Sequence, residues 1–108
     1  MVFKNIDTKI NDLGEGVSRK VLAHGGKIMG VEVSFEKGSI GSIHRHEHEQ
    51  VSYVLDGKFK VTIDDKESIL TKGDSFYAGA NIAHGVFALE KGMLLDVFTP
   101  QRDEFLDK

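Results

Sequence analysis

Short apolar segments separated by glycine-containing turns run along most of the chain. Apolar and polar side chains alternate strictly in residues 31–35 (VEVSF) and 58–63 (KFKVTI), which is typical of strands with one buried face. Across the chain the pattern predicts eight strands, at residues 17–24, 27–36, 50–56, 58–64, 67–71, 75–78, 84–89 and 93–99. Evenly spaced short strands in 108 residues predict an all-β, antiparallel sandwich or barrel, commonly a jelly roll, in one domain spanning residues 1–108.

Two local signals refine this prediction. The pair Asp56-Gly57 lies between two predicted strands and favours the positive backbone angles of a type I′ turn, so we expect a β-hairpin there. The other signal lies after Pro100, where residues 101–108 are expected to form one or two helical turns.

Composition narrows the classes of function. The chain has 40% hydrophobic and 29% charged residues, and its apolar runs are too short to span a bilayer, so we expect no membrane partner. Its net charge is -3 and its lysines are scattered among acids, which argues against nucleic-acid binding. With no cysteine, the chain has no disulfide, thiolate metal ligand or cysteine nucleophile.

The N-terminal segment, residues 1–10, also bears on location and assembly. It carries Lys4, Asp7 and Lys9 among its apolar residues, unlike the continuous apolar stretch of a secretory signal, so we expect a cytoplasmic protein. A small sheet protein has exposed strand edges, and pairing of such edges favours a homodimer, with residues 1–10 as the candidate contact.

The histidines are the candidate chemistry. His44, His46 and His48 occupy alternate positions, and Gln50 continues the same parity, so on an extended strand all four would share one face. His84 begins another predicted strand. Imidazoles from two segments can form a metal site that suits zinc, copper, iron or nickel, whereas the structural alternative is a histidine-rich loop at a strand edge. We expect His48 to support the site or lie exposed rather than bind metal directly.

The spacing of these residues is regular over two segments. Five residues separate Gly38 from His44, one separates His44 from His46, three separate His46 from Gln50, six separate Gln50 from Gly57, and His84 lies eleven positions after Gly73. This spacing resembles the two motifs of the cupin family, with Gln50 in place of the usual glutamate and with Gly79, Asn81 and Ala88 departing from the second motif.

The cupin resemblance implies one divalent transition-metal ion bound by His44, His46, Gln50 and His84. Nickel, zinc, iron and manganese all remain candidates. A neutral glutamine leaves the ion with one more unit of positive charge than glutamate would, which favours polarisation of bound oxygens. A weaker fourth ligand is equally consistent with low metal affinity.

Nearly the whole chain, from residue 17 onward, resembles the KdgF-type cupins, the small single-domain cupins of pectin and uronate breakdown. The resemblance is carried by the stretches VSFEKGSIGSIHRHEHEQVSYVLDGKFKV and KGDSFYAGANIAHGVFALEKGMLLDVFTPQRDEFL. It implies an enzyme that converts a cyclic 4,5-unsaturated uronate monosaccharide into its linear keto-deoxy form. It also matches the active-site carboxylate, aromatic residue and arginine of that family to Asp96, Phe98 and Arg102.

Each of these three residues has a structural alternative. Asp96 shares a strand face with Phe98, so it is either a proton-transferring acid whose pKa depends on burial and nearby cations, or a hydrogen-bonded structural acid. Phe98 either fills the core or contacts a sugar face. Arg102 either binds a uronate carboxylate in bidentate fashion or pairs at the surface with Asp103 or Glu104.

Two other functions stay open on the sequence. A cupin dioxygenase would use an iron, nickel or copper ion with open coordination positions and would consume oxygen. A non-catalytic module would bind a sugar or metal in the same pocket without forming product.

Overall fold

The structure, a computed structural model, describes residues 1–106 and consists of ten strands and two 3-10 turns. The strands are β1 (Ile10–Gly14), β2 (Val17–Gly25), β3 (Ile28–Phe35), β4 (Ile40–His44), β5 (Glu49–Asp56), β6 (Lys58–Ile63), β7 (Lys66–Thr71), β8 (Ser75–Ala78), β9 (His84–Ala88) and β10 (Gly92–Thr99). The turns are η1 (Asn5–Asp7) and η2 (Asp103–Phe105), and neither could cross a membrane.

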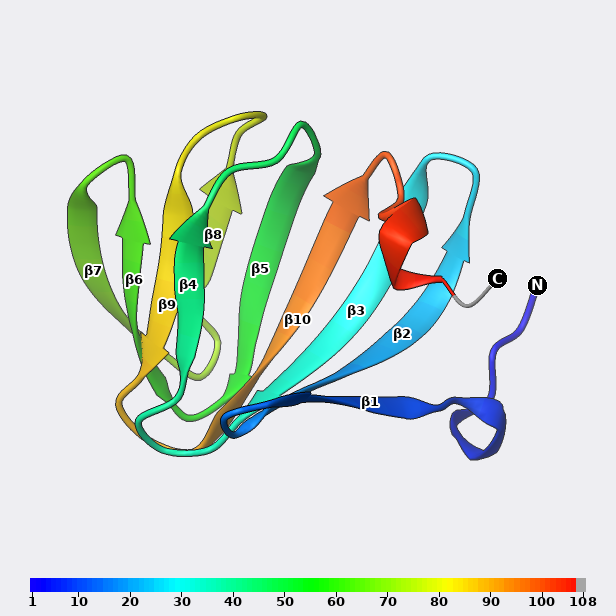
Figure 1. Cartoon of the computed structure of the whole chain (residues 1–108), viewed down its shortest axis with the longest axis horizontal. Coiled ribbons are helices and arrows are strands. Elements are labelled where there is room, and N and C mark those ends of the chain that lie inside the picture. Colours follow the sequence, from blue (N-terminus) through cyan, green and yellow to red (C-terminus); the bar gives the residue numbers. More distant parts are fainter. Residues whose placement is uncertain (107–108) are drawn as a thin grey trace.

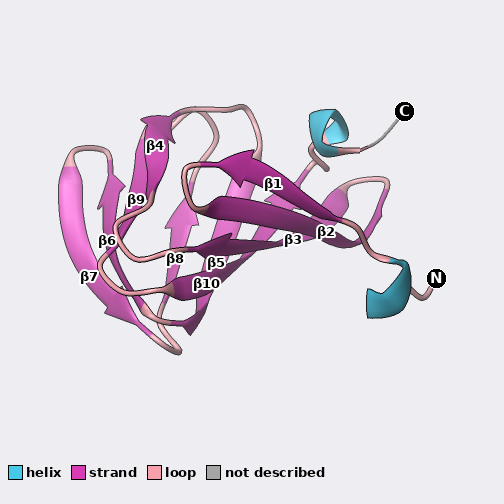
Figure 2. Cartoon of the chain, turned by 60° about the horizontal axis from the view of Figure 1, so that its bottom comes forward, coloured by secondary structure: helices cyan, strands magenta, loops and turns pink. Residues whose placement is uncertain are grey.

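The strands form two antiparallel sheets that face each other (Figure 1). Six strands are ordered β1-β2-β3-β10-β5-β8, and the other four are ordered β4-β9-β6-β7. Figure 2 shows that strands make up nearly all of the regular secondary structure. The predicted all-β, antiparallel fold is therefore confirmed, and it takes the form of two facing sheets.

The larger hydrophobic cluster fills one end of this sandwich. Strand β5 alternates between buried and exposed residues, and its inward side chain Val54 packs in a cluster of six buried apolar residues: Phe35, Val54, Phe59, Val61, Ala88 and Leu94. The rings of Phe35 and Phe59, one from each sheet, meet edge to face with centroids 5.3 Å apart. The cluster lies where β3 and β9 end and β6 and β10 begin, at the bottom of Figure 1.

Polar residues take the place of apolar ones toward the opposite end of the sandwich. On the inner face of β5, Gln50 and Ser52 precede Val54, and all three are buried. The neighbouring β10 pairs Asp96 with Ser52 and Phe98 with Gln50. The expected shared face of Asp96 and Phe98 is therefore confirmed, and it points between the sheets.

The predicted hairpin at Asp56-Gly57 is wrong. Strand β5 pairs with β10 and β8, whereas β6 pairs with β7 and β9, so at Gly57 the chain crosses from one sheet to the other. Gly57 has φ +87 there. A two-residue hairpin with positive φ at both positions does occur, at Asp64 (φ 49) and Asp65 (φ 66), and it joins β6 to β7.

Two strands were absent from the prediction. Strands β1 and β4 are mostly exposed along their length, so neither has the apolar alternation by which the other strands were recognised. The helical prediction for residues 101–108 is confirmed only as the short turn η2, and its last two positions lie outside the described residues.

Candidate metal centre and cavity

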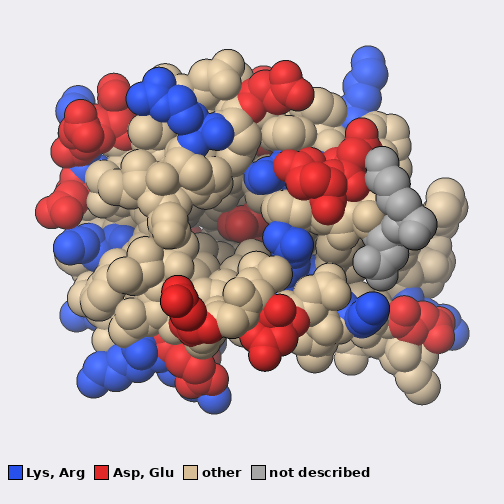
Figure 3. Space-filling model, in the orientation of Figure 1, with Lys and Arg blue, Asp and Glu red and all other residues tan. Residues whose placement is uncertain are grey.

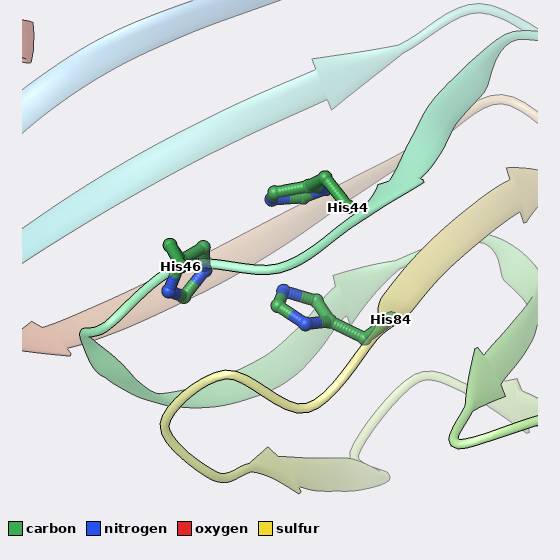
Figure 4. A group of neighbouring side chains, drawn as sticks. All are labelled: His44, His46 and His84. Carbon is green, nitrogen blue, oxygen red and sulfur yellow. The ribbon is translucent and has the colours of Figure 1, made fainter.

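Three histidines converge at the polar end of the sandwich. His44 is the last residue of β4 and lies directly opposite His84, the first residue of β9, in the antiparallel pair. His46 follows in the loop, and the three rings face one another (Figure 4). One nitrogen of each ring lies within 4.8 Å of the others, so this histidine triad could hold a metal ion.

The residues of the site lie on different elements from those that the alternating sequence positions predicted. We expected four alternate residues to share one face of a strand, but β4 ends at His44 and β5 begins only at Glu49. His46 and His48 lie in the intervening loop, and Gln50 reaches the site from the other sheet. The side chains therefore meet because the loop joins two facing sheets.

Backbone carbonyls orient all three rings. The Nδ1 atoms of His44, His46 and His84 lie 2.7–2.9 Å from the carbonyl oxygens of Ser42, His48 and Ile82, respectively. An Nδ1–H donating to a carbonyl leaves Nε2 unprotonated, with its lone pair aimed at the centre of the triad. Burial lowers the pKa of His46 and of His84, which favours the neutral, ligating form.

The amide of Gln50 completes the cluster. Its Oε1 lies 3.1 Å from Nε2 of His46 and 3.1 Å from Nε2 of His84. In this tautomeric state all three atoms are acceptors, and acceptors this close repel unless a cation lies between them. Ligands bound at about 2.1 Å and at angles of roughly 90–110° lie about 3.0–3.4 Å apart, so the spacing fits a shared metal ion.

A hydrogen-bonded chain leads from Gln50 away from the triad. Gln50 Nε2 donates to Ser52 Oγ at 2.8 Å, and Ser52 Oγ donates to Asp96 Oδ1 at 2.6 Å. These bonds turn Oε1 of Gln50 toward the histidines. Burial raises the pKa of Asp96 to about 6, although the Ser52 hydrogen bond and the charge of Arg102 act in the opposite direction.

A cavity of about 280 Å³ opens beside the triad. His44, His84 and Gln50 line it together with Asp96, Phe98 and Arg102. Figure 3 shows a hollow on this face of the molecule with acidic atoms recessed inside it. The structure thus brings six of the seven predicted site residues to one cavity, with His46 in the adjoining triad.

Arg102 and Phe98 line the cavity and also make contacts that stabilise the fold. The Arg102 side chain is only 13% exposed, and its Nε donates to Glu104 Oε2 at 2.8 Å, so the expected acidic partner is Glu104. Its guanidinium carbon lies 5.1 Å from the ring centre of Phe98. Phe98 is 3% exposed and packs in a second core cluster with Met29 and Val31.

His48 lies beside the triad rather than in it. Its carbonyl oxygen contacts Nδ1 of His46, and the two rings are 5.5 Å apart. Within residues 1–106, Nδ1 of His48 is buried without a hydrogen-bond partner. His48 is not among the three histidines grouped as possible metal ligands, and its role in supporting the site stays a prediction.

The sequence analysis missed three residues of this region. Ser52 links Gln50 to Asp96, and Arg19 and Phe105 line the cavity near Arg102. The signal for Ser52 was present, because it follows Gln50 by two positions on an alternating strand. Neither Arg19 nor Phe105 had such a signal, since their position depends on how β2 and η2 pack across the opening.

The sandwich and its histidine triad define the class. The family described as "Cupin domain" matches residues 31–98, and this chain belongs to the cupin family. An RmlC-like cupin from Shewanella frigidimarina NCIMB 400 superposes with a TM-score of 0.93 at 38% identity, covering 97% of this chain and 95% of the other.

Within the cupins, the chain is similar to proteins named KdgF. It is 42% identical over 106 residues to the pectin degradation protein KdgF of Dickeya dadantii (strain 3937), covering 96% of each chain. It also superposes on KdgF from Halomonas sp. with a TM-score of 0.93 at 37% identity, covering 98% of both chains. The resemblance drawn from the sequence is confirmed.

Proposed function

We propose that this protein is a metal-dependent enzyme that converts a cyclic 4,5-unsaturated uronate monosaccharide into its linear keto-deoxy form. The observation that carries the proposal is the placement of a metal-ligand cluster, a carboxyl group with a raised pKa and an arginine around one cavity. The cavity volume, about 280 Å³, is near the lower limit of ligand pockets and suits a single sugar. Similarity to a protein named for pectin degradation supports the same substrate class.

The histidine triad and Oε1 of Gln50 would hold the ion, which nickel, zinc, iron or manganese could supply. When bound, the metal would polarise sugar oxygens as a Lewis acid. The protein's own part is to keep three neutral imidazoles and one amide oxygen facing a common point, through the backbone carbonyls behind the rings and Ser52 behind the amide.

Asp96 would move the proton that the reaction requires. Removal of the proton from the C1 hydroxyl forms the C1 carbonyl as the bond from C1 to the ring oxygen breaks, and the electron pair remains on that oxygen as an enolate. Protonation of C4 then yields the C5 ketone, so one proton leaves oxygen and one reaches carbon. A carboxyl group with a pKa of about 6 is suited to both transfers near neutral pH.

Arg102 and Phe98 would position the sugar. The Nε of Arg102 is held by Glu104, which leaves its terminal nitrogens to bind the uronate carboxylate. Phe98 lies in the cavity wall under this guanidinium and offers an apolar surface to the sugar ring.

The direct test is anaerobic incubation of metal-analysed protein with freshly generated 4,5-unsaturated galacturonate, following loss of the enol-ether absorbance. We expect loss faster than the spontaneous rate, dependent on metal and abolished by His46→Ala. Asp96→Asn should lower the rate by about 100- to 10,000-fold, and a loss under about threefold would remove Asp96 from the proposed role.

The same assay separates the competing functions. A dioxygenase needs oxygen and would show no turnover under anaerobic conditions. A binding module would bind the uronate without forming product. Protein that holds one metal per chain and gives no acceleration would refute the enzyme proposal.

We also propose that the chain, as a single cupin domain, acts in the cytoplasm as a homodimer on a small molecule, without nucleic-acid or membrane partners. Exposed apolar residues in the N-terminal segment, among them Met1, Val2 and Ile6, support a contact there. Light scattering of the full chain and of Ile6→Glu tests the dimer, which the substitution should dissociate. Cell fractionation tests the location.

A further inference from the structure

Arg19 is a second arginine in the cavity that the proposed reaction leaves without a role. It lies on β2, opposite Val33 of β3, which in turn lies opposite Leu94 of β10. Val33 and Leu94 line the same cavity as Arg19, so its side chain belongs to the inner face of the six-stranded sheet. A long cation among apolar neighbours is unfavourable unless a partner compensates its charge.

Phe105 holds the two arginines near each other. The guanidinium carbon of Arg19 lies 3.8 Å from the centre of the Phe105 ring, and that of Arg102 lies 4.4 Å from it. Phe105 belongs to η2, so this turn fixes both cations at the cavity wall. Stacking on an aromatic ring orients a guanidinium without using its hydrogen-bond donors.

The two arginines differ in their hydrogen-bond partners. Arg102 donates its Nε to the Glu104 carboxylate, whereas Nε of Arg19 is buried and has no hydrogen-bond partner within residues 1–106. Burial and then the charge of Arg102 lower the pKa of Arg19, and the charge of Glu104 raises it in part. Two like charges stacked on one ring repel each other, and Glu104 alone does not offset this. An anion bound between them would relieve this repulsion and supply the missing acceptor.

We propose that Arg19 is a substrate-binding residue that, together with Arg102, forms a paired arginine site for the carboxylate of a uronic acid. The inference deepens the proposed function and rests on it for the identity of the substrate. It also assigns a role to η2, which holds the paired site in place through Phe105. Selection of acidic over neutral sugars is the property that this site confers.

The test measures binding rather than turnover. Metal-loaded protein is titrated calorimetrically with galacturonate, a saturated uronate that cannot undergo the reaction, and with galactose, which carries a hydroxymethyl group where galacturonate has its carboxylate. We expect the wild type to prefer galacturonate. Arg19→Gln should weaken galacturonate binding by about 10- to 100-fold, the loss of a charge-assisted hydrogen bond, and leave galactose binding unchanged.

Lys20→Gln is the matched control. It removes the same charge from the adjacent position on β2, where Lys20 contacts Asn5 and Glu32 instead of the cavity. The control should bind both sugars as the wild type does. Arg19→Lys retains the charge without the planar fork, should weaken galacturonate binding several-fold, and decides the question if circular dichroism shows Arg19→Gln to be unfolded.

The outcomes distinguish a failure of this proposal from a failure of the proposed enzymatic function. Equal galacturonate affinity in wild type and the folded Arg19 variants overturns the role of Arg19, even if the enzyme turns over unsaturated uronate normally. A wild type without preference for galacturonate over galactose overturns it as well. Selective binding that depends on Arg19, without turnover of the unsaturated uronate, supports the paired arginine site and refutes the proposed reaction.

Discussion

Ser52 joins Gln50 to Asp96, and replacing it with alanine removes both hydrogen bonds at once. Ser52 is fully buried at 0% exposure, so water cannot replace the hydroxyl. The substitution leaves a donor of Gln50 and an acceptor of Asp96 without this partner, and a buried group that loses its partner costs about 1–3 kcal/mol. We therefore expect the free energy of unfolding of Ser52→Ala to fall by about 2–4 kcal/mol.

Urea denaturation of the metal-free protein near pH 7.5 measures this loss. At that pH Asp96 is ionised and depends most on the hydroxyl, because the Ser52 hydrogen bond lowers the pKa of Asp96. Ser68→Ala is the control, since Ser68 is exposed on β7, and its unfolding free energy should match that of the wild type. A change below about 0.5 kcal/mol for Ser52→Ala would refute the reasoning.

The same variant should also bind metal less tightly. Without Ser52 the amide of Gln50 loses the contact that turns Oε1 toward the histidines, and loss of such a supporting contact lowers metal affinity by about 10- to 100-fold. Competition with a chromogenic chelator measures the change. Unaltered affinity would mean that the amide is oriented by the rings alone.

Three further predictions concern pH, metal and the sheet crossing. Asp96 has a pKa of about 6 in the folded protein and about 3.8 in the unfolded chain, so the stability of the metal-free wild type relative to Asp96→Asn should fall as the pH rises from about 3.8 to 6. Denaturation midpoints that show no such trend would contradict the raised pKa. Removing metal with a chelator should abolish turnover and lower Tm, and added divalent metal should restore both; full activity of metal-free protein would contradict the role of the triad. Gly57→Ala should destabilise the fold by about 2 kcal/mol or more, because the new Cβ would lie 2.6 Å from backbone atoms of Gly92 and Lys91. Gly25→Ala is the control, since its new Cβ meets nothing within 4 Å, and equal denaturation midpoints for the two variants would contradict the predicted clash at Gly57.

The sequence was informative where the relevant physics is local. Alternation on β3 and β6 predicted strands with one buried face, because side chains on successive strand residues point to opposite sides. The same alternation placed Asp96 and Phe98 on one inner face. Strand partners are set by packing between distant segments, and Asp56-Gly57, which favours a turn locally, in fact connects two different sheets.

The sequence predicted the candidate metal ligands of the site but not the residues that surround them in the cavity. Spacing brought His44, His46 and His84 together as candidates, although the parity argument placed His46 on a strand when it lies in a loop. The contact of Arg19 with Phe105 depends on how residues far apart in sequence, on β2 and in η2, meet over the cavity. No periodicity in a single sequence encodes such a contact.

The amide of Gln50 bears on which sequences this site can tolerate. One end of an amide accepts hydrogen bonds and the other donates them, so Gln50 faces the histidines with its oxygen while its Nε2 donates a hydrogen bond to Ser52. An ionised glutamate at this position would only accept, and the single proton of Ser52 would then have to serve either that carboxylate or Asp96. Exchange of Gln50 for glutamate therefore requires a compensating change at Ser52 or Asp96, and the three positions should vary together among relatives that retain the cavity.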